Sequence, residues 1–320
     1  MANFSANRHH ARMERLEIWR ITDTTPGHLS QTAGLIAALE RVRKVAVRDI
    51  PAWRPLQLPT QLFFPPFKQL PDASPDLILC CGHRTHLTAL ALRRAYGGKL
   101  IVLMKPTLPL RLFDLVVVPR HDGVRASPCV IQTEGALNPL TAAGPHHADR
   151  GVILIGGPSR HHDWRSSSIV EQVRRLVSGS PGVRWTLTTS RRTPEDSDAA
   201  LRGLRLPNLE IVPFKQTPPG WVAEQLALVA TAWVSEDSVS MLYEALTAGV
   251  AVGVLDVPRR GHSRINRGID HLVTDRRVVR FTNWTPEVPL PRSEPLAEAD
   301  RVAAEIIKRW FGRVEHGPVR

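Results

Sequence analysis

Hydrophobic side chains fall into short runs that alternate with amphipathic stretches of helical period. Residues 16–22 alternate apolar and polar positions, whereas residues 76–81 and 151–155 form almost continuous apolar runs. Each run is followed by a loop and then by apolar positions at helical spacing. Apolar strands that alternate with helices are typical of a parallel sheet that is buried on both faces. The pattern therefore predicts an α/β fold.

The alternation is interrupted once, near the middle of the chain. Residues 138–150 are polar and contain proline and glycine, after which the strand-and-helix pattern starts again. Because this composition marks loops between packed elements, we place a domain boundary here. We expect two Rossmann-like, doubly wound domains at residues 16–145 and 150–295, preceded by a disordered basic leader at residues 1–15 and followed by a helix within residues 296–320.

The best-defined junction between a strand and a helix lies at residues 233–249, with the sequence WVSEDSVSMLYEALTAG. Ser235, Asp237 and Ser238 are residue types that cap helices, and apolar positions follow them at helical spacing. A helix that begins where a strand ends directs free N–H groups and the positive end of its dipole to one place, which favours phosphate binding. The alternative is a capped crossover that binds no ligand.

Similar polar loops follow other predicted strands of the second half. In a doubly wound sheet, ligands bind beyond the carboxyl ends of the strands. Glycine lets the backbone approach a ligand, hydroxyls donate hydrogen bonds, and arginine pairs with phosphate. The loops supply the following candidates for a donor diphosphate: Gly156, Gly157, Ser159, Arg160, Ser190, Arg191, Ser235, Asp237, Ser238, Val239 and Ser240, with Arg259, Arg260 and Arg264 after a later strand. The alternative is that these surface side chains are only solvated.

Three ionisable residues are candidates for further roles. Glu244, inside the predicted helix, is suited to accept hydrogen bonds from sugar hydroxyls. His28, in the loop after the first strand, is suited to deprotonate a hydroxyl group, and Asp23 is a second candidate base. The alternatives are a solvated carboxylate at Glu244 and a capping or structural imidazole at His28.

The net charge of the chain indicates which classes of molecule it is suited to bind. The 320 residues carry a formal net charge of +12, which favours anionic partners. The sequence contains no RNP-like aromatic motif, zinc finger or basic-region helix, so no nucleic acid is expected.

Motifs for several other chemistries are missing from the sequence. The three cysteines lack metal-ligand spacing, and the paired histidines are sequence neighbours, which rarely share a metal, so we expect neither a metal nor a cofactor. There is no GxSxG motif or P-loop, which argues against acyl transfer and ATP hydrolysis. Cysteine usage, the absence of an apolar leader and the absence of an apolar run of about 18 residues predict a cytoplasmic protein.

An aromatic and basic segment interrupts the first half. Residues 51–75 are rich in proline and contain Phe63, Phe64, Phe67 and Lys68. Aromatic side chains beside cations suit the interface of an anionic membrane, which predicts peripheral contact with the inner face of the cytoplasmic membrane. The alternative is a loop whose aromatic side chains pack back on the domain.

Taken together, several motifs resemble the ELM1-like family, also called the mitochondrial fission ELM1 or DUF1022 family. The resemblance extends over roughly residues 18–273 and is carried by TDTTPGHLSQTAGL, GHRTHLTALALRR, KPTLPLRLFDLVVVPRHD, TEGALNP, GGPSRHHDW, TTSRRTP and SEDSVSM-x-x-EAL-x-x-G. The family is similar to GT-B glycosyltransferases of the MurG-like type. The resemblance implies two domains that face each other across a cleft, with the last helix returning to the first domain.

The resemblance also implies roles for particular residues. The second domain would hold a nucleotide-sugar, with residues 235–240 at the diphosphate and Glu244 at the ribose or sugar. The first domain would hold the acceptor, which points to Gly27, Gln31, Arg84, Thr85 and His86. No metal would be needed, because arginines and a helix N-terminus stabilise the departing diphosphate. The first loop reads TTPGH instead of the GGTGGH of MurG-like proteins, so His28 is a hypothesis for the catalytic base.

Three functions remain open from the sequence. The first is a metal-independent glycosyltransferase that moves a sugar from a nucleotide donor to a membrane glycolipid or a cell-envelope saccharide. The second is a non-catalytic adaptor of GT-B fold at a membrane surface. The third is a nucleotide-sugar epimerase, which would interconvert the donor without an acceptor.

Overall fold

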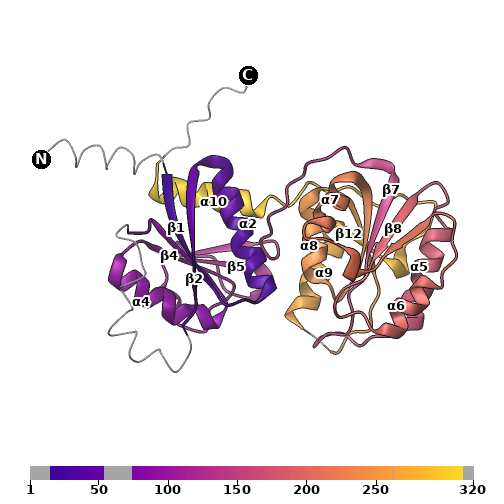
Figure 1. Cartoon of the computed structure of the whole chain (residues 1–320), viewed down its shortest axis with the longest axis horizontal. Helices are drawn as coiled ribbons and strands as arrows, with labels where there is room; N and C mark the ends of the chain where they lie inside the picture. The colour runs from indigo at the N-terminus through magenta and orange to yellow at the C-terminus, as the bar shows by residue number, and fades with distance from the viewer. Residues whose placement is uncertain (1–14, 54–73, 262, 313–320) are drawn as a thin grey trace, which may run out of the picture. The chain divides into compact units, whose positions relative to one another are not determined.

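The computed structural model describes residues 15–53, 74–261 and 263–312 (Figure 1). The described residues divide into two compact units. Unit 2 comprises Leu140–Leu296, and unit 1 comprises the described residues before and after it. The predicted leader and the aromatic segment with Phe63, Phe64, Phe67 and Lys68 lie outside the described residues.

Unit 1 is built on a six-stranded parallel sheet. Its strands are β1 (Arg15–Thr22), β2 (Lys44–Pro51), β3 (Leu77–Cys81), β4 (Lys99–Leu103), β5 (Leu115–Pro119) and β6 (Val130–Thr133). The helices are α2 (Pro26–Val42), α4 (His86–Tyr96) and α10 (Glu298–Trp310), with 3₁₀ turns η3 (His83–Thr85), η4 (Leu110–Leu112) and η5 (Arg120–Asp122). The strand order is β2-β1-β3-β4-β5-β6.

Helices cover both faces of this sheet. Successive strand residues point to opposite faces, so Ile18 packs with α2 and α10, whereas Trp19 packs with α4. Helix α10 packs Val302 and Ile306 into the same core as α2, and the Asp300 carboxylate pairs with Arg41 at 2.6 Å. The final helix therefore belongs to the first domain, as expected.

Unit 2 repeats this plan with its own sheet. Its strands are β7 (His147–Leu154), β8 (Arg184–Thr188), β9 (Leu209–Val212), β10 (Val229–Ser235), β11 (Ala251–Leu255) and β12 (Val278–Arg280). The helices are α5 (Ser166–Ser178), α6 (Glu195–Arg202), α7 (Trp221–Leu228), α8 (Val239–Ala248) and α9 (Arg264–Thr274), with 3₁₀ turns η6 (Phe214–Gln216) and η7 (Phe281–Asn283). The order is β12-β11-β10-β7-β8-β9, again parallel.

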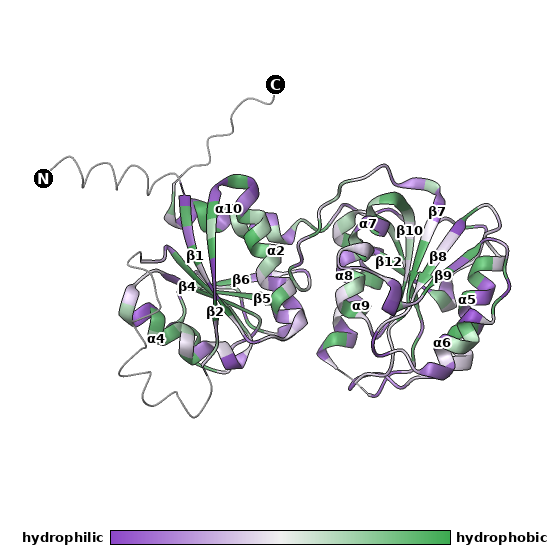
Figure 2. Cartoon of the chain, viewed as in Figure 1, coloured by the Kyte–Doolittle hydropathy of each residue, from purple (hydrophilic) through white to green (hydrophobic). Residues whose placement is uncertain are grey.

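The inner strands of both sheets are mostly hydrophobic, with hydrophilic residues at some strand ends such as the start of β7, and the surrounding helices carry both hydrophobic and hydrophilic residues (Figure 2). In unit 2, α8 and α9 close one core through Leu242 and Ile269, and α5 closes the other through Val173. The prediction of an α/β fold with two Rossmann-like domains is confirmed.

Two element boundaries differ from the expectation. Strand β7 begins at His147, inside the polar stretch 138–150, because its exposed first half still pairs with β10 at Val229. The apolar positions of residues 30–39 predict a helix that begins at Ser30, but α2 begins four residues earlier, at Pro26, because proline has a φ suited to the first helical position.

The strand orders fix where ligand-binding crevices form. In unit 2 the chain runs outward through β7, β8 and β9 and then returns to β10 on the other side of β7. In unit 1 the same reversal separates β1 from β3. Loops leave opposite faces of a sheet at such a switch point, so a crevice opens between them at the carboxyl ends of the strands.

Candidate functional site

A pocket of about 380 Å³ lies at the switch point of unit 2. Its walls come from the loop after β7, the loop after β8 and the start of α8. The lining residues are Ser159, Arg160, His161, His162, Arg192, Asp237, Ser238, Val239, Ser240, Met241 and Ile265. Six of the predicted donor residues are thus brought together here: Ser159, Arg160, Asp237, Ser238, Val239 and Ser240. We call this the donor pocket.

The N-terminus of α8 forms one wall of the donor pocket. The first intrahelical bond runs from the Leu242 N–H to the Ser238 carbonyl at 3.1 Å, so the N–H groups of Val239, Ser240 and Met241 precede the helical ladder. The first turn contains no acidic residue. Unpaired N–H groups and the helix dipole make this wall attractive to an anion.

Two arginines add positive charge to the pocket. Arg160 is exposed and makes no ion pair with any described residue. Arg192 is half-exposed and reaches across to the Asp237 carboxylate at 2.8 Å and to the carbonyl oxygen of Gly157 at 3.1 Å. A diphosphate that enters the pocket therefore meets one free guanidinium and one already oriented by the protein.

Asp237 organises the loops around the pocket. Its side chain is fully buried and accepts hydrogen bonds from the Ser235 hydroxyl at 2.8 Å and the Gly157 N–H at 2.9 Å, in addition to Arg192. One carboxylate thus joins the loops after β7, β8 and β10. We conclude that Asp237, which lines the pocket, and Ser235 behind it hold the loops of the pocket together.

Gly156 and Gly157, the two glycines after β7 that were predicted to bind phosphate, have a structural role. The Gly156 N–H donates to the Ser235 hydroxyl at 2.7 Å, and the Gly157 N–H is bonded to Asp237, so neither is available to a phosphate. A Cβ at Gly156 would lie 2.1 Å from the Asp237 carboxylate, and one at Gly157 would lie 2.1 Å from the Arg192 carbonyl. Glycine is needed here for close packing between loops.

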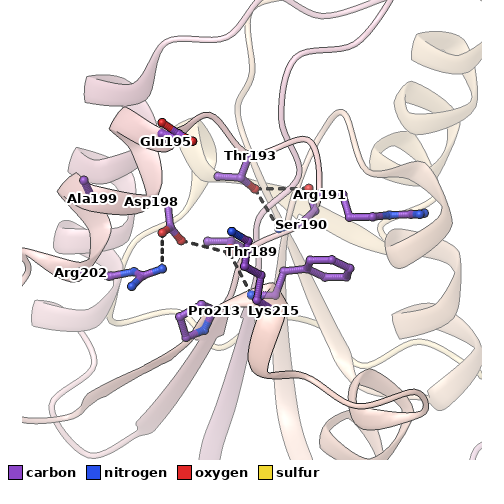
Figure 3. A pocket seen from close by; sticks show the side chains of 11 residues that line it. Thr189, Ser190, Arg191, Thr193, Glu195, Asp198, Ala199, Arg202, Pro213 and Lys215 are labelled. Carbon is purple, nitrogen blue, oxygen red and sulfur yellow. Dashed lines mark hydrogen bonds and ion pairs between the residues drawn. The ribbon is translucent and has the colours of Figure 1, made fainter.

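A second pocket of about 600 Å³ lies at the ends of β8 and β9 (Figure 3). It is lined by Ser190, Arg191 and Thr193 from one loop, by α6, and by the turn at Phe214 and Lys215. Arg191 lies over the Phe214 ring, 6.0 Å from its centroid. We call this the side pocket. An exposed ring beside cations offers a stacking surface for a planar, electron-rich group.

One tight turn connects the two pockets. The Thr193 N–H bonds to the Ser190 carbonyl at 3.1 Å, which places Arg191 and Arg192 at the tip of the turn with their side chains in different pockets. The sequence pattern pointed to Arg191 as a candidate but not to Arg192. The only indication in the sequence was that two arginines are adjacent. The conformation of the turn decides which of them lines the donor pocket.

Glu244 lies one helical turn from the donor pocket. It follows Ser240 by four residues and therefore shares its face of α8. No described residue donates a hydrogen bond to its carboxylate, and burial raises the pKa of Glu244 to about 7. A carboxyl group that is largely buried and unpaired is suited to bind hydroxyl groups.

The arginines after β11 are committed to other partners. Arg259 pairs with the buried Glu236 and with Asp270, and Arg280 joins the same network. Burial favours a higher pKa for Glu236, but the hydrogen bonds and charges of Arg280 and Arg259 outweigh it and lower the pKa. Arg260 pairs with Asp163. Arg259 and Arg260, considered above as phosphate ligands, are thus paired with carboxylates of the protein, Arg259 in a partly buried network and Arg260 at the surface.

His162 forms part of the pocket floor. Its side chain is buried, Nδ1 lies 3.2 Å from the Ser159 hydroxyl, and Nε2 has no partner among the described residues. Burial lowers the pKa of His162, against the opposing charges of Glu236 and Asp237. A neutral imidazole therefore lies beneath the cationic wall.

The switch point of unit 1 holds a carboxylate–imidazole pair. Asp23 Oδ2 lies 2.8 Å from His28 Nδ1, and the Asp23 carboxylate also accepts the Thr25 N–H at 3.1 Å. Burial raises the pKa of Asp23, but the hydrogen bonds from His28 and Thr25 reverse the effect and lower it. Asp23 therefore orients the His28 ring through Nδ1, and no hydrogen bond to Nε2 is found among the described residues. The two candidate bases form one dyad.

Gly82, at the end of β3, makes room for this dyad. Its φ is +86°, and a Cβ there would lie 2.2 Å from His28 Cε1. The His28 ring therefore packs directly on the backbone of the loop after β3, which joins the two sides of the switch point. Any larger side chain at Gly82 would displace the ring.

The predicted acceptor residues occupy different surroundings. Gly27 and Arg84 are exposed, whereas Gln31 and Thr85 are buried. His86 is buried beside Phe113, and burial lowers its pKa to about 4.

No group of three His, Cys, Asp or Glu side chains among the described residues could hold a metal ion. Asp196 and Asp198, two carboxylates separated by one residue, lie on α6, and Asp198 pairs with Arg202. Within the described part of the chain, no helix is both long and apolar enough to cross a bilayer.

Solved structures with the same fold include proteins that handle nucleotide-sugars. A candidate UDP-N-acetylglucosamine 2-epimerase from Listeria monocytogenes aligns with a TM-score of 0.59 at 13% identity, covering 95% of this chain and 100% of that one. The MnaA–UDP complex of S. aureus aligns with a TM-score of 0.50 at 14% identity, with the same coverage. The glycosyltransferase of kitacinnamycin gives 0.52 at 14% identity, covering 93% and 99%. These similarities show the GT-B fold.

Sequence comparison identifies the family. A relative from Rickettsia prowazekii, uncharacterized protein RP120, is 23% identical over 355 aligned positions, covering 92% of this chain and 98% of the relative. The family model named mitochondrial fission ELM1 matches residues 26–310, which include His28 and the residues of the donor pocket but begin after Asp23. This chain therefore belongs to the mitochondrial fission ELM1 family.

Proposed function

We propose that the chain is a metal-independent glycosyltransferase that takes a sugar from a nucleoside-diphosphate donor. The observation that carries the proposal is the donor pocket, where the free N–H groups of α8 and the guanidinium groups of Arg160 and Arg192 converge at a switch point. The UDP complex of S. aureus MnaA supports this choice of ligand, because it has the same fold.

The donor would use both pockets of unit 2. The diphosphate lies at the N-terminus of α8, and the nucleoside enters the side pocket, where Phe214 and Arg191 offer a stacking surface for the base. Glu244 accepts hydrogen bonds from ribose or sugar hydroxyls. The Arg192 turn, which borders both pockets, aligns the two parts of the ligand.

The dyad of unit 1 supplies the base. His28 Nε2 removes the proton from an acceptor hydroxyl, and Asp23 stabilises the resulting imidazolium. The acceptor oxygen forms a bond to the anomeric carbon while the bond from that carbon to the diphosphate breaks. The charge that develops on the diphosphate is stabilised by Arg160, Arg192 and the α8 N–H groups. We propose a membrane glycolipid or cell-envelope saccharide as acceptor and a cytoplasmic location at the inner membrane face.

Calorimetric titration of the full chain with UDP, GDP, ADP and CMP, and with their sugar derivatives, tests the donor proposal. We expect one nucleotide series to bind, and the double variant Arg160→Gln, Arg192→Gln to weaken its binding by about 30- to 1000-fold, since each lost charged hydrogen bond costs about 1–2 kcal/mol. Arg174→Gln, an exposed arginine of α5, is the matched control and leaves the affinity unchanged. If no nucleotide binds, the proposal is wrong.

An epimerase would use the same donor pocket without an acceptor. Because a candidate UDP-N-acetylglucosamine 2-epimerase from Listeria monocytogenes has a similar structure, epimerisation is the second function to test. Incubation with the bound nucleotide-sugar alone, followed by NMR of the sugar ring, distinguishes the two. A new sugar of unchanged mass supports the epimerase. Transfer that requires added envelope lipid or saccharide supports the glycosyltransferase, and binding without either reaction supports an adaptor.

A further inference from the structure

The part of unit 1 around α4 carries positive charge that the nearby sequence does not balance. Residues 77–113, from the start of β3 to the residue before Asp114, contain no Asp or Glu. They contain six Lys or Arg residues, of which Arg93 and Lys99 pair with Asp114. The others are exposed and form no ion pair with any described residue: Arg84, Arg94, Lys105 and Arg111. Their charge is therefore available to an anionic partner.

The segment after β4 lies alongside α4. The Thr107 hydroxyl is 3.5 Å from Nδ1 of His86, the first residue of the helix. Near the other end of α4, Arg93 donates a hydrogen bond to the Leu112 carbonyl at 3.0 Å. Residues 107–112 thus follow the helix from its first turn to its last, and the two elements form one continuous surface.

Leucine side chains lie on this surface among the cations. Leu87, Leu90 and Arg94 are spaced by three and four residues and therefore share one face of α4. Leu87 is 40% exposed and Leu90 is half-buried. Leu108 and Leu110 are also half-buried, and they pack against the same core as Leu90. Apolar side chains flanked by unpaired cations are suited to the interface of an anionic membrane.

We propose that this surface docks the protein on an anionic lipid bilayer. We call it the α4 surface, and its main contacts are Arg84, Leu87, Arg94, Lys105, Leu110 and Arg111. The cations pair with lipid phosphates, and the leucines enter the boundary between headgroups and acyl chains. The leucines favour a bilayer over a nucleic acid, which proteins bind through cations and aromatic rings.

The α4 surface adjoins the dyad. Gly82, whose backbone packs against the His28 ring, is followed directly by η3 with Arg84 and then by α4. Docking through this surface therefore brings the Asp23–His28 dyad next to lipid headgroups, where a lipid-linked acceptor hydroxyl is found. This consequence rests on the glycosyltransferase proposal, whereas docking itself does not.

Flotation of the full chain with lipid vesicles provides the test. We expect binding to phosphatidylcholine vesicles that contain about one third phosphatidylglycerol, weaker binding at high salt, and no binding to phosphatidylcholine alone. The combined variant Arg94→Gln, Lys105→Gln, Arg111→Gln should bind about 100-fold more weakly, since each cation near an anionic surface contributes about fivefold. Leu87→Gln should weaken binding about threefold, because one leucine no longer enters the bilayer.

A matched variant separates this surface from the net charge of the chain. Arg165→Gln, Arg205→Gln and Arg267→Gln together remove the same charge from exposed positions of unit 2 and should weaken binding less than about threefold. The proposal is overturned if both triple variants lose equal affinity, if Leu87→Gln has no effect, or if uncharged vesicles bind equally well. It is also overturned if a single-stranded RNA binds this surface more tightly than the vesicles do. A chain that binds vesicles but no nucleotide contradicts only the glycosyltransferase proposal.

Discussion

The two switch points of this protein occupy equivalent places in two parallel sheets, yet they hold opposite chemistry. In unit 2 the loops converge on N–H groups and guanidinium groups, which attract an anion. In unit 1 they converge on an imidazole that a carboxylate orients, an arrangement suited to accept a proton. The fold places loops at one edge, and a few loop residues decide whether that edge binds charge or moves protons.

The loops are also held by different means. In unit 2 a fully buried carboxylate, Asp237, collects donors from neighbouring loops. In unit 1 the contact depends on Gly82, which lets the His28 ring lie against the backbone. Substitutions at the two switch points should therefore fail in different ways, the first in folding and the second in catalysis.

The largest effect is expected from removal of the base. His28→Ala should reduce glycosyl transfer by about 10²–10⁴-fold, the usual contribution of a general base, and should leave nucleotide affinity unchanged because the donor pocket is built from unit 2 alone. Asp23→Asn should also reduce the rate, because His28 loses the group that orients it. Single-turnover transfer assays and nucleotide titrations measure both quantities. His271→Ala, at an exposed histidine of α9, is the control, and equal loss of nucleotide affinity in His28→Ala would contradict the division of roles.

Removal of Asp237 should mainly affect folding. Asp237→Ala leaves Arg192 and the Gly157 N–H without their buried partner, which is expected to cost about 3–5 kcal/mol of unfolding free energy. Asp163→Ala, which breaks the exposed pair with Arg260, should cost less than about 1 kcal/mol. Urea unfolding monitored by circular dichroism compares the two variants. Similar small losses would show that Asp237 does not hold the loops together.

Substitution of Glu244 should change the free energy of unfolding by a smaller amount, and this change should depend on pH. Its pKa is about 7 in the folded chain and near 4.5 when unfolded, so ionisation favours the unfolded state increasingly between these values. Below about pH 4.5 both states are protonated and the carboxyl has no net effect. Glu244→Gln should therefore gain stability over the wild type as pH rises from 4.5 to 7, reaching about 2–3 kcal/mol at pH 8.

Urea unfolding at several pH values measures the difference between Glu244→Gln and the wild type. Glu224→Gln, on the exposed side of α7, serves as the control for loss of a carboxylate. A difference that is constant with pH, or that decreases towards pH 8, would show that burial does not control Glu244.

The site residues differ in how far the sequence could locate them. Ser238, Val239 and Ser240 were predictable because a helix start after a buried strand has a local pattern. Arg192 was not, because a tight turn assigns it and Arg191 to different pockets. Gly156 and Gly157 were assigned to a ligand, whereas the space they leave is filled by Asp237 and Arg192 from other loops.

The sequence by itself determined the alternation of strands and helices, the two similar halves and the family, because these follow from local hydrophobic period and from motifs. It also placed Asp23 and His28 close together after the first strand, although the structure shows His28 in the first turn of α2 and not in the predicted loop. Only the tertiary structure paired them, buried Asp237 and committed Arg259 to Glu236. These outcomes depend on which loops meet at the end of a sheet, and that is decided by strand order, which no local pattern encodes.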